Sequence, residues 1–228
     1  MEFESFIGID WSGDKNKFQK GISVAICYPG KNAPKIIKPL EKYWSRDSLI
    51  NWLTKIITSK KTLVGFDFSF SYPFYDYNSY FPGIRDIAIS PMSLWRLIDK
   101  INSNEKNYYG GKIWNSKPYN EYYNSPLLRG VNYESRRRLT EIYSKNSAYS
   151  PSPTFNCVGP GAVGTGSLAG MRILNFLKEI MNIWPFVDDI TSNKSVAVEI
   201  FPTYYFRLSN IKPQKKVGYS IKDINISL

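Results

Sequence analysis

The chain has 228 residues, of which 43% are hydrophobic and 21% charged, so it can bury the core of one sizeable α/β domain, whereas two full domains would be crowded. It has no histidine and only two cysteines, Cys27 and Cys157, which excludes Ser-His-Asp and Cys-His catalysis and argues against a zinc site. The net charge of +11 favours an acidic partner such as nucleic acid, with a solubilising basic surface as the alternative.

Targeting and membrane segments are not expected. No apolar run approaches the roughly 20 residues that a membrane span needs. The N-terminal sequence MEFESFIGID lacks the basic, apolar and cleavage regions of a signal peptide. The two cysteines lie in separate apolar segments, so no disulfide framework is indicated. We therefore expect a cytoplasmic protein with no membrane association.

Strands and one helix are predicted over the first third of the chain. Apolar runs predict three strands, over residues 3–13, 20–30 and 34–43. A helix over residues 45–61 follows, with Ser45 or Asp47 as its N-cap. Residues 62–70 are predicted as a fourth, buried strand. Three consecutive strands favour an antiparallel meander, and the helix then allows the fourth strand to lie parallel beside the first.

Residues 75–150 have a different composition and are predicted to form a helical insertion. One helix is expected over residues 90–103, with Ser90 as its N-cap and Pro91 in the first turn, and another over residues 132–145. Between them, residues 104–126 are rich in Asn, Tyr, Gly and Pro and are predicted to be an irregular loop. Its lysines and aromatic rings could bind phosphates and bases, but we favour packing of the loop by its own aromatic residues.

The rest of the chain completes an α/β order. A glycine-rich loop over residues 159–166 precedes a helix over about 167–181, and a fifth strand is predicted over residues 195–202. The predicted order is three strands, a helix, a strand, a helical insertion and a strand. This order is that of an RNase H-like mixed sheet with flanking helices. We expect a single such domain over residues 1–228.

Three acidic residues lie within apolar strands, near their C-terminal ends: Asp10, Asp67 and Glu199. Carboxylates there are costly to bury unless they are paired or bind a metal ion. If the first and fourth strands are neighbours, Asp10 and Asp67 project into one crevice at the edge of the sheet. Such a cluster suits Mg²⁺ or Mn²⁺ and supports phosphodiester cleavage without histidine. The alternative is that these acids cap loops or pair with arginine.

Basic residues and loop residues are the candidate contacts to substrate phosphate. Three successive arginines, residues 136–138, would spread over about 200° of a helix, so they cannot all face one ligand. We predict that Arg137 and Arg138 contact phosphate or pair with Glu134 and Glu141. The remaining candidates for substrate binding are Ser12, Gly161, Gly164, Thr165 and Ser167.

The glycine loop contains G-P-G-A-V-G, which matches the G-x-G-x-x-G pattern of dinucleotide sites. It lies late in the chain, no strand acid follows at the expected spacing, and Pro160 removes an N–H, so we expect no dinucleotide cofactor. The glycines leave the N–H groups of the following helix open to an anion, with Thr165 or Ser167 as cap. The alternative is a tight turn that lets the helix pack closely on the sheet.

Five segments together carry a resemblance to a known family: GIDWSG from Gly8, VGFDFSFSYP from Val64, GPGAVGTGSLAG from Gly159, IWPF from Ile183 and VEIFPTYYF from Val198. In their order and spacing the chain resembles the domain-of-unknown-function family of predicted RNase H-like nucleases, over about residues 3–206. The motif RRLTE from Arg137 is similar to an Arg-x-x-Glu element of that family's insertion. The resemblance implies an RNase H-like fold and acidic roles for Asp10, Asp67 and Glu199, whereas nuclease activity in the family is itself largely inferred from fold.

The chain departs from the family pattern at two places. Family members usually carry another acid on a C-terminal helix, whereas this chain stops at Leu228, where Asp223 is a possible stand-in. Val187 occupies a position that is often Glu in the family, with Asp188 and Asp189 just after it. Either the fourth metal ligand is rebuilt, or catalysis is weak or lost.

These features predict a metal-dependent nuclease or phosphodiesterase, with Asp10, Asp67 and Glu199 as catalytic residues that bind Mg²⁺ or Mn²⁺. One alternative is a non-catalytic nucleic-acid-binding or assembly protein that retains the fold. Another is an ATP-dependent phosphotransferase of the actin-like group, which shares a similar first strand. That group needs two such domains and a phosphate loop richer in Gly and Thr, so this alternative fits less well.

Overall fold

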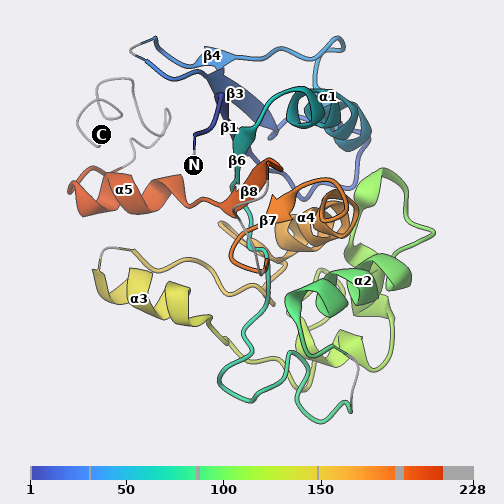
Figure 1. Cartoon of the computed structure of the whole chain (residues 1–228). Coiled ribbons are helices and arrows are strands. Elements are labelled where there is room, and N and C mark those ends of the chain that lie inside the picture. Colours follow the sequence, from blue (N-terminus) through green and yellow to red (C-terminus); the bar gives the residue numbers. More distant parts are fainter. Residues whose placement is uncertain (1, 31, 86–87, 148, 188–192, 213–228) are drawn as a thin grey trace.

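The computed structural model describes residues 2–30, 32–85, 88–147, 149–187 and 193–212 (Figure 1). Six strands form the main sheet, in the order β4 (Lys35–Ile36), β3 (Ser23–Cys27), β1 (Ser5–Asp10), β6 (Thr62–Phe66), β8 (Val196–Glu199) and β7 (Asn182–Ile183). β3 is antiparallel to both of its neighbours, β4 and β1, and β1, β6, β8 and β7 are mutually parallel. The structure thus confirms an α/β chain with a meander followed by parallel strands.

The longer strands agree with the apolar pattern of the sequence, whereas the two-residue strands do not. In β1, Ser5, Ile7 and Ile9 are buried and alternate with more exposed residues, as expected for a strand covered on one face. The third predicted strand shrinks to the two residues of β4, since its prolines lack the N–H that a ladder needs. A small ribbon of β2 (Phe18–Gln19) and β5 (Trp44–Ser45) was not predicted, because two residues carry no readable periodicity.

The first two helices begin where their caps predict. In α1 (Arg46–Ser59), Ser45 Oγ accepts from the Ser48 N–H at 3.0 Å, and the Ser48 hydroxyl reaches back to the Ser45 N–H. Ser90 caps α2 (Pro91–Ile101) in the same way, so both predicted N-caps are confirmed. In Figure 1, α1 and α4 (Gly164–Leu177) lie on the same side of the sheet, and α5 (Pro202–Leu208) lies on the other.

Two later helices begin elsewhere than predicted. The third, α3 (Leu139–Ser147), starts after the triple arginine, and Glu141 accepts from the Arg138 N–H at 3.0 Å, as an N3 glutamate does at a helix start. The fourth, α4, starts at Gly164, and its N-cap is Val163, which makes no side-chain cap. Thr165 and Ser167 therefore lie inside the helix, and the prediction that one of them caps it was wrong.

The insertion contains three short 3₁₀ helices, η1 (Lys106–Tyr108), η2 (Gly111–Asn115) and η3 (Tyr119–Tyr122). Tyr119, Tyr122 and Tyr123 pack on rings from other segments, and these residues join the core of the sheet in one hydrophobic cluster. The rings in this contact group are Tyr72, Phe81, Tyr119, Tyr122, Tyr123 and Phe155. The aromatic rings of residues 104–126 therefore hold the loop against the rest of the fold, and Tyr109 and Trp114 also pack on each other within it.

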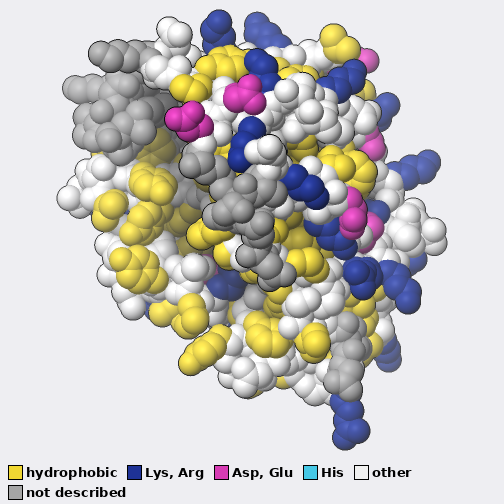
Figure 2. All heavy atoms as spheres, in the orientation of Figure 1, with side chains coloured by type: hydrophobic (Ala, Val, Ile, Leu, Met, Phe, Trp, Pro, Cys, Tyr) yellow, Lys and Arg dark blue, Asp and Glu magenta, His cyan; other side chains and the backbone are white. Residues whose placement is uncertain are grey.

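Charge and apolar surface are unevenly distributed. Figure 2 shows Lys and Arg side chains mainly along the top and right of this face, over α1 and around α2. Exposed hydrophobic side chains gather at the left, over α3 and α5, and include Leu139, Tyr143 and Tyr205. In the part of the chain that the structure describes, no helix has the length and apolar character needed to cross a membrane.

Candidate functional site

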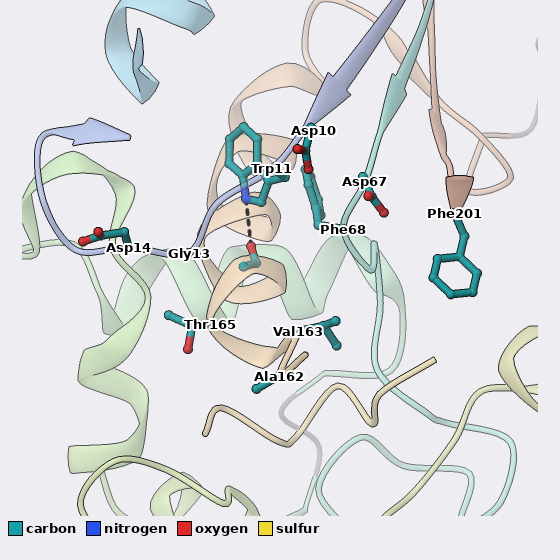
Figure 3. Close-up of a pocket in the computed structure, with 11 residues that line it drawn as sticks. Asp10, Trp11, Gly13, Asp14, Asp67, Phe68, Ala162, Val163, Thr165 and Phe201 are labelled. Atoms are coloured by element: carbon teal, nitrogen blue, oxygen red, sulfur yellow. Dashed lines mark hydrogen bonds between the residues drawn. The ribbon is translucent and has the colours of Figure 1, made fainter. Parts of the chain in front are cut away.

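The C-terminal ends of two neighbouring parallel strands bring Asp10 and Asp67 together. β1 and β6 pair in register up to Ile9 and Phe66, and the Asp67 N–H donates to the Ile9 carbonyl at 3.0 Å. The next position on each strand is an aspartate, so both carboxylates lie at the same edge of the sheet. A cavity of about 470 Å³ opens there, and both residues line it (Figure 3).

The two carboxyl groups lie where their charged forms are disfavoured. Burial, followed by the charges of Asp10 and Glu199, raises the pKa of Asp67 to about 6. Partial burial also raises the pKa of Asp10, although a hydrogen bond from the Trp11 backbone opposes this shift. Among the described residues, no Lys or Arg forms an ion pair with either group. The pocket therefore holds negative charge that a cation would stabilise.

The start of α4 forms the opposite wall of the pocket. Ala162, Val163, Thr165 and Gly166 line it, and Figure 3 shows the first three below Asp10 and Asp67. The loop before the helix turns through Gly159 and Gly161, whose φ angles of +87° and +72° favour glycine. The Gly164 N–H donates to the Asn156 carbonyl at 2.9 Å, and the rest of this helix start, which has no side-chain cap, offers partial positive charge to an anion. The pocket thus offers carboxylates on one side and anion-binding groups on the other.

Helix α4 also fixes the positions of both aspartates through their chain neighbours. Trp11 Nε1, next to Asp10, donates to the Gly166 carbonyl at 3.0 Å. Phe68, next to Asp67, packs so tightly on α4 that a Cβ at Gly170 would lie 2.2 Å from its ring. The Ser69 N–H donates to Ser167 Oγ at 3.3 Å. The first turns of this helix therefore set the spacing of the two carboxylates.

Glu199 lies near this pair but is engaged differently. It pairs with Phe66 in the sheet, so it lies one position before the row of Asp10 and Asp67. Its Oε1 and Oε2 each accept from Arg138 at 2.6 Å, and Oε2 also accepts from the Phe70 N–H at 2.9 Å. Its charge still contributes to the raised pKa of Asp67. A metal role for Glu199 would therefore require Arg138 to release it.

Arg138 is held by carboxylates on two sides. Besides Glu199, it bonds Glu141 through Nε at 2.8 Å. Burial alone would lower the pKa of Arg138, but Glu199 and Glu141 raise it above its ordinary value. Of the two roles expected for Arg138, the structure shows pairing with Glu141, and a phosphate contact would have to compete with both carboxylates. Accordingly, no group of three or more acidic or cysteine side chains is placed to hold one metal ion within the described residues.

Other predicted contacts fall outside the pocket. Arg137 donates to the Pro151 carbonyl, and the Ser12 carbonyl accepts from Arg46 at 2.6 Å. Ser167 is buried and donates to the Val163 carbonyl at 3.0 Å. Gly164 packs against Cys157, and Gly161 shapes the preceding loop. Among the predicted substrate contacts, Thr165 lines the pocket.

Several residues of the pocket were missed by sequence reasoning. Trp11, Asp14, Phe68 and Phe201 line it, and each lies within four residues of a predicted acid in the sequence. Arg46 was also missed, although it is fully buried and donates to the carbonyls of Ser12 and Asp14. The signal for the pocket residues was their proximity to Asp10, Asp67 and Glu199 in the chain. Nothing in the sequence singled out Arg46, because an arginine in the first turn of a helix is expected to be exposed to solvent.

Three acids proposed as replacements for a missing ligand, Asp188, Asp189 and Asp223, lie outside the described residues. A scan against protein-family models and searches of curated proteins and of solved structures found no match to this chain.

Proposed function

We propose that this protein is a divalent-metal-dependent phosphodiester hydrolase of the RNase H-like type, with nucleic acid as its substrate. The observation that carries the proposal is the pair of Asp10 and Asp67 on adjacent parallel strands, facing the start of α4 across one pocket. The sheet order β4-β3-β1-β6-β8, with β3 antiparallel, is the arrangement expected of an RNase H-like core and supports the same class. The motif resemblance and the net charge of +11 point in the same direction.

The donor set fits a hard divalent cation. Asp10 and Asp67 would hold Mg²⁺ or Mn²⁺ through carboxylate oxygens, whereas the carboxylate of Asp14, which also lines the pocket, accepts from the Asn16 N–H at 2.8 Å. When bound, such an ion supplies Lewis-acid stabilisation of a phosphoryl oxygen and lowers the pKa of bound water. Because Asp67 must be ionised to ligate a cation, metal affinity is expected to increase as the pH rises through about 6.

The chain's own groups would position the substrate. The N–H groups of Thr165 and Gly166, in the first turn of α4 and on the pocket wall, would bind a phosphate oxygen. The rings of Trp11, Phe68 and Phe201 line the pocket and would exclude water around the reacting phosphate.

One observation favours a second candidate, a nucleic-acid-binding protein that does not cleave. Glu199 is bound by Arg138 on both oxygens, so the third carboxylate is neutralised by a side chain of the same molecule. A site with two free aspartates binds a cation more weakly than one with three, and weaker binding would favour recognition over cleavage.

Cleavage assays separate the two candidates. Labelled single-stranded, duplex and hybrid oligonucleotides are incubated with the full chain in Mg²⁺, Mn²⁺ or a chelator. We expect metal-dependent cleavage that Asp10→Asn and Asp67→Asn each reduce by more than about 100-fold. Asp47→Asn, the same change at an exposed position on α1, should cleave like the wild type. Absence of cleavage in the wild type, or its persistence in Asp10→Asn, would overturn the hydrolase proposal.

A further inference from the structure

A second hollow, of about 490 Å³, opens on the insertion. Three lysines line it, Lys15, Lys106 and Lys112, against one acidic residue, Glu105. Apolar and aromatic side chains complete the wall, namely Tyr109, Trp114 and Leu127. Tyr109 is half-buried and packs edge-to-face on Trp114 at 6.0 Å, and Leu127 is 62% exposed. The hollow thus combines positive charge with apolar surface.

This hollow adjoins the aspartate pocket. Gly13 and Asp14 line the aspartate pocket, and the next residue, Lys15, lines the hollow. Asn107, which also lines the hollow, donates through Nδ2 to the Lys15 carbonyl at 3.2 Å. Burial is the main cause of the raised pKa of Tyr109, and the charge of Asp14 contributes to it, so the two walls lie within electrostatic range. A ligand extending past Asp14 from the aspartate pocket would therefore meet the lysines.

Two buried arginines hold the wall of the hollow in place. Arg46 donates to the Asn107 carbonyl at 2.6 Å and, from its other nitrogen, to the carbonyl of Asp14 at 2.9 Å. Arg172 donates to the carbonyls of Glu105 and Tyr109, at 3.2 and 2.8 Å. The backbone between these anchors has positive φ at Asn107 and Tyr108, +58° and +53°, which is uncommon outside glycine. Such a conformation persists where surrounding contacts enforce it, so the wall is preformed.

We propose that this hollow binds a neighbouring nucleotide of a single-stranded nucleic acid whose phosphodiester lies in the aspartate pocket. Lys15, Lys106 and Lys112 contact the backbone phosphate, and the base lies against Tyr109 and Leu127. A single strand is favoured because a base must be unpaired to present its face to an apolar wall. This inference rests on the proposed function for the choice of substrate, but its test measures binding alone.

The test compares two double charge reversals with equal effects on net charge. Lys106→Glu with Lys112→Glu alters the hollow, and Lys38→Glu with Lys55→Glu alters exposed lysines that line neither pocket. Binding of a fluorescein-labelled single strand of about 12 nucleotides is followed by anisotropy in a chelator, which prevents metal-dependent cleavage. We expect the first pair to weaken binding by about tenfold or more and to flatten its salt dependence, and the second pair to weaken it by less than about threefold. Equal losses in the two pairs would overturn the inference.

A second measurement uses the wild type and needs no variant to fold. An abasic strand of the same length and charge is expected to bind about tenfold more weakly than the strand with bases, and a duplex likewise. Equal affinity for all three would show that bases do not enter the hollow and would overturn the inference. If binding behaves as expected and no substrate is cleaved in Mg²⁺ or Mn²⁺, the hydrolase proposal fails and this inference stands. If cleavage requires Asp10 but the Lys106→Glu, Lys112→Glu variant binds the strand like the wild type, this inference fails and the hydrolase proposal stands.

Discussion

Asp67 follows a buried strand, where burial and the charges of Asp10 and Glu199 raise its pKa to about 6. The folded protein therefore binds a proton at Asp67 more tightly than the unfolded chain does. As the pH rises from about 4 through 6, Asp67 ionises at the expense of the stability of the folded state. A carboxyl group whose ionisation destabilises the fold, in a pocket open to solvent, is typical of a residue kept for function rather than for stability.

Replacing Asp67 with Asn should stabilise the folded protein at neutral and alkaline pH. The neutral amide removes the buried charge and its repulsion from Asp10, so at about pH 8 we expect the free energy of unfolding to increase by about 2 kcal/mol. At about pH 4, where Asp67 is protonated in the folded state, the difference should vanish. Urea unfolding across this range measures it, and a variant less stable than the wild type at pH 8 would contradict the prediction.

Asp76 provides a matched control, because the same substitution there should change the stability at neutral pH in the opposite direction. A hydrogen bond and the charge of Arg136 lower the pKa of Asp76, and the two are joined at 2.5 Å. Its contribution to stability is therefore present above its unfolded pKa and is lost as the pH falls. Asp76→Asn should be less stable than the wild type at about pH 8, and the two should converge under acid conditions.

At the residue scale, the sequence predicts that Asp10 and Asp67 share one crevice, but not how Glu199 is engaged. Asp10, Asp67 and Glu199 interrupt apolar strands, and that signal is local. The register of β8 against β6 is not local, because Val196, Ala197 and Val198 are all apolar and give no alternation to align. Sequence reasoning therefore could not place Glu199 opposite Phe66, where Arg138 binds it.

At the element scale, α4 holds the segments that follow both aspartates. Gly13 lies against its first turn, and an added Cβ there would lie 2.4 Å from the Gly166 nitrogen and 2.5 Å from the Thr165 carbonyl carbon. These are backbone atoms, so no side-chain rotation can relieve the contact. The loop from Asp10 to Asp14 therefore depends on glycine for its approach to the helix.

Gly13→Ala should destabilise the protein and displace this loop. We expect the free energy of unfolding to fall by about 1–3 kcal/mol, because the clash is with backbone. Gly8→Ala on β1 is the control, since a Cβ there meets no atom within 4 Å, and its effect should stay within about 0.5 kcal/mol. Chemical denaturation of both variants decides the matter, and equal stability of the two would refute this account of Gly13.

Sequence reasoning located helices best where their ends are set by neighbouring side chains. Ser45 and Ser90 cap α1 and α2 through residues three positions away, so both starts were predictable. The starts of α3 and α4 also involve distant partners, although Glu141 adds a local contact at the start of α3. Arg138 is held by Glu199, and Gly164 packs against Cys157, so tertiary contacts rather than propensity fix these ends.

At the scale of the whole molecule, cation binding should appear as a gain in stability. A ligand at about 100 times its Kd stabilises by about 2.7 kcal/mol, which for a chain of this size is a rise in Tm of about 5–10 °C. We expect Mn²⁺ or Mg²⁺ to produce this rise in the wild type and in Asp47→Asn, but not in Asp10→Asn. A thermal shift titration tests this, and an equal rise in Asp10→Asn would place the cation elsewhere.

The two outer strands of the sheet, β4 and β7, contain two residues each in the described structure. Pro34 directly precedes β4, and Pro185 closely follows β7, and neither residue has an N–H to offer. A strand from a second molecule would find little backbone to pair with at either edge, so these edges resist the sheet-to-sheet growth that leads to fibrils. Association between copies of this protein through the two edges of the main sheet is therefore disfavoured.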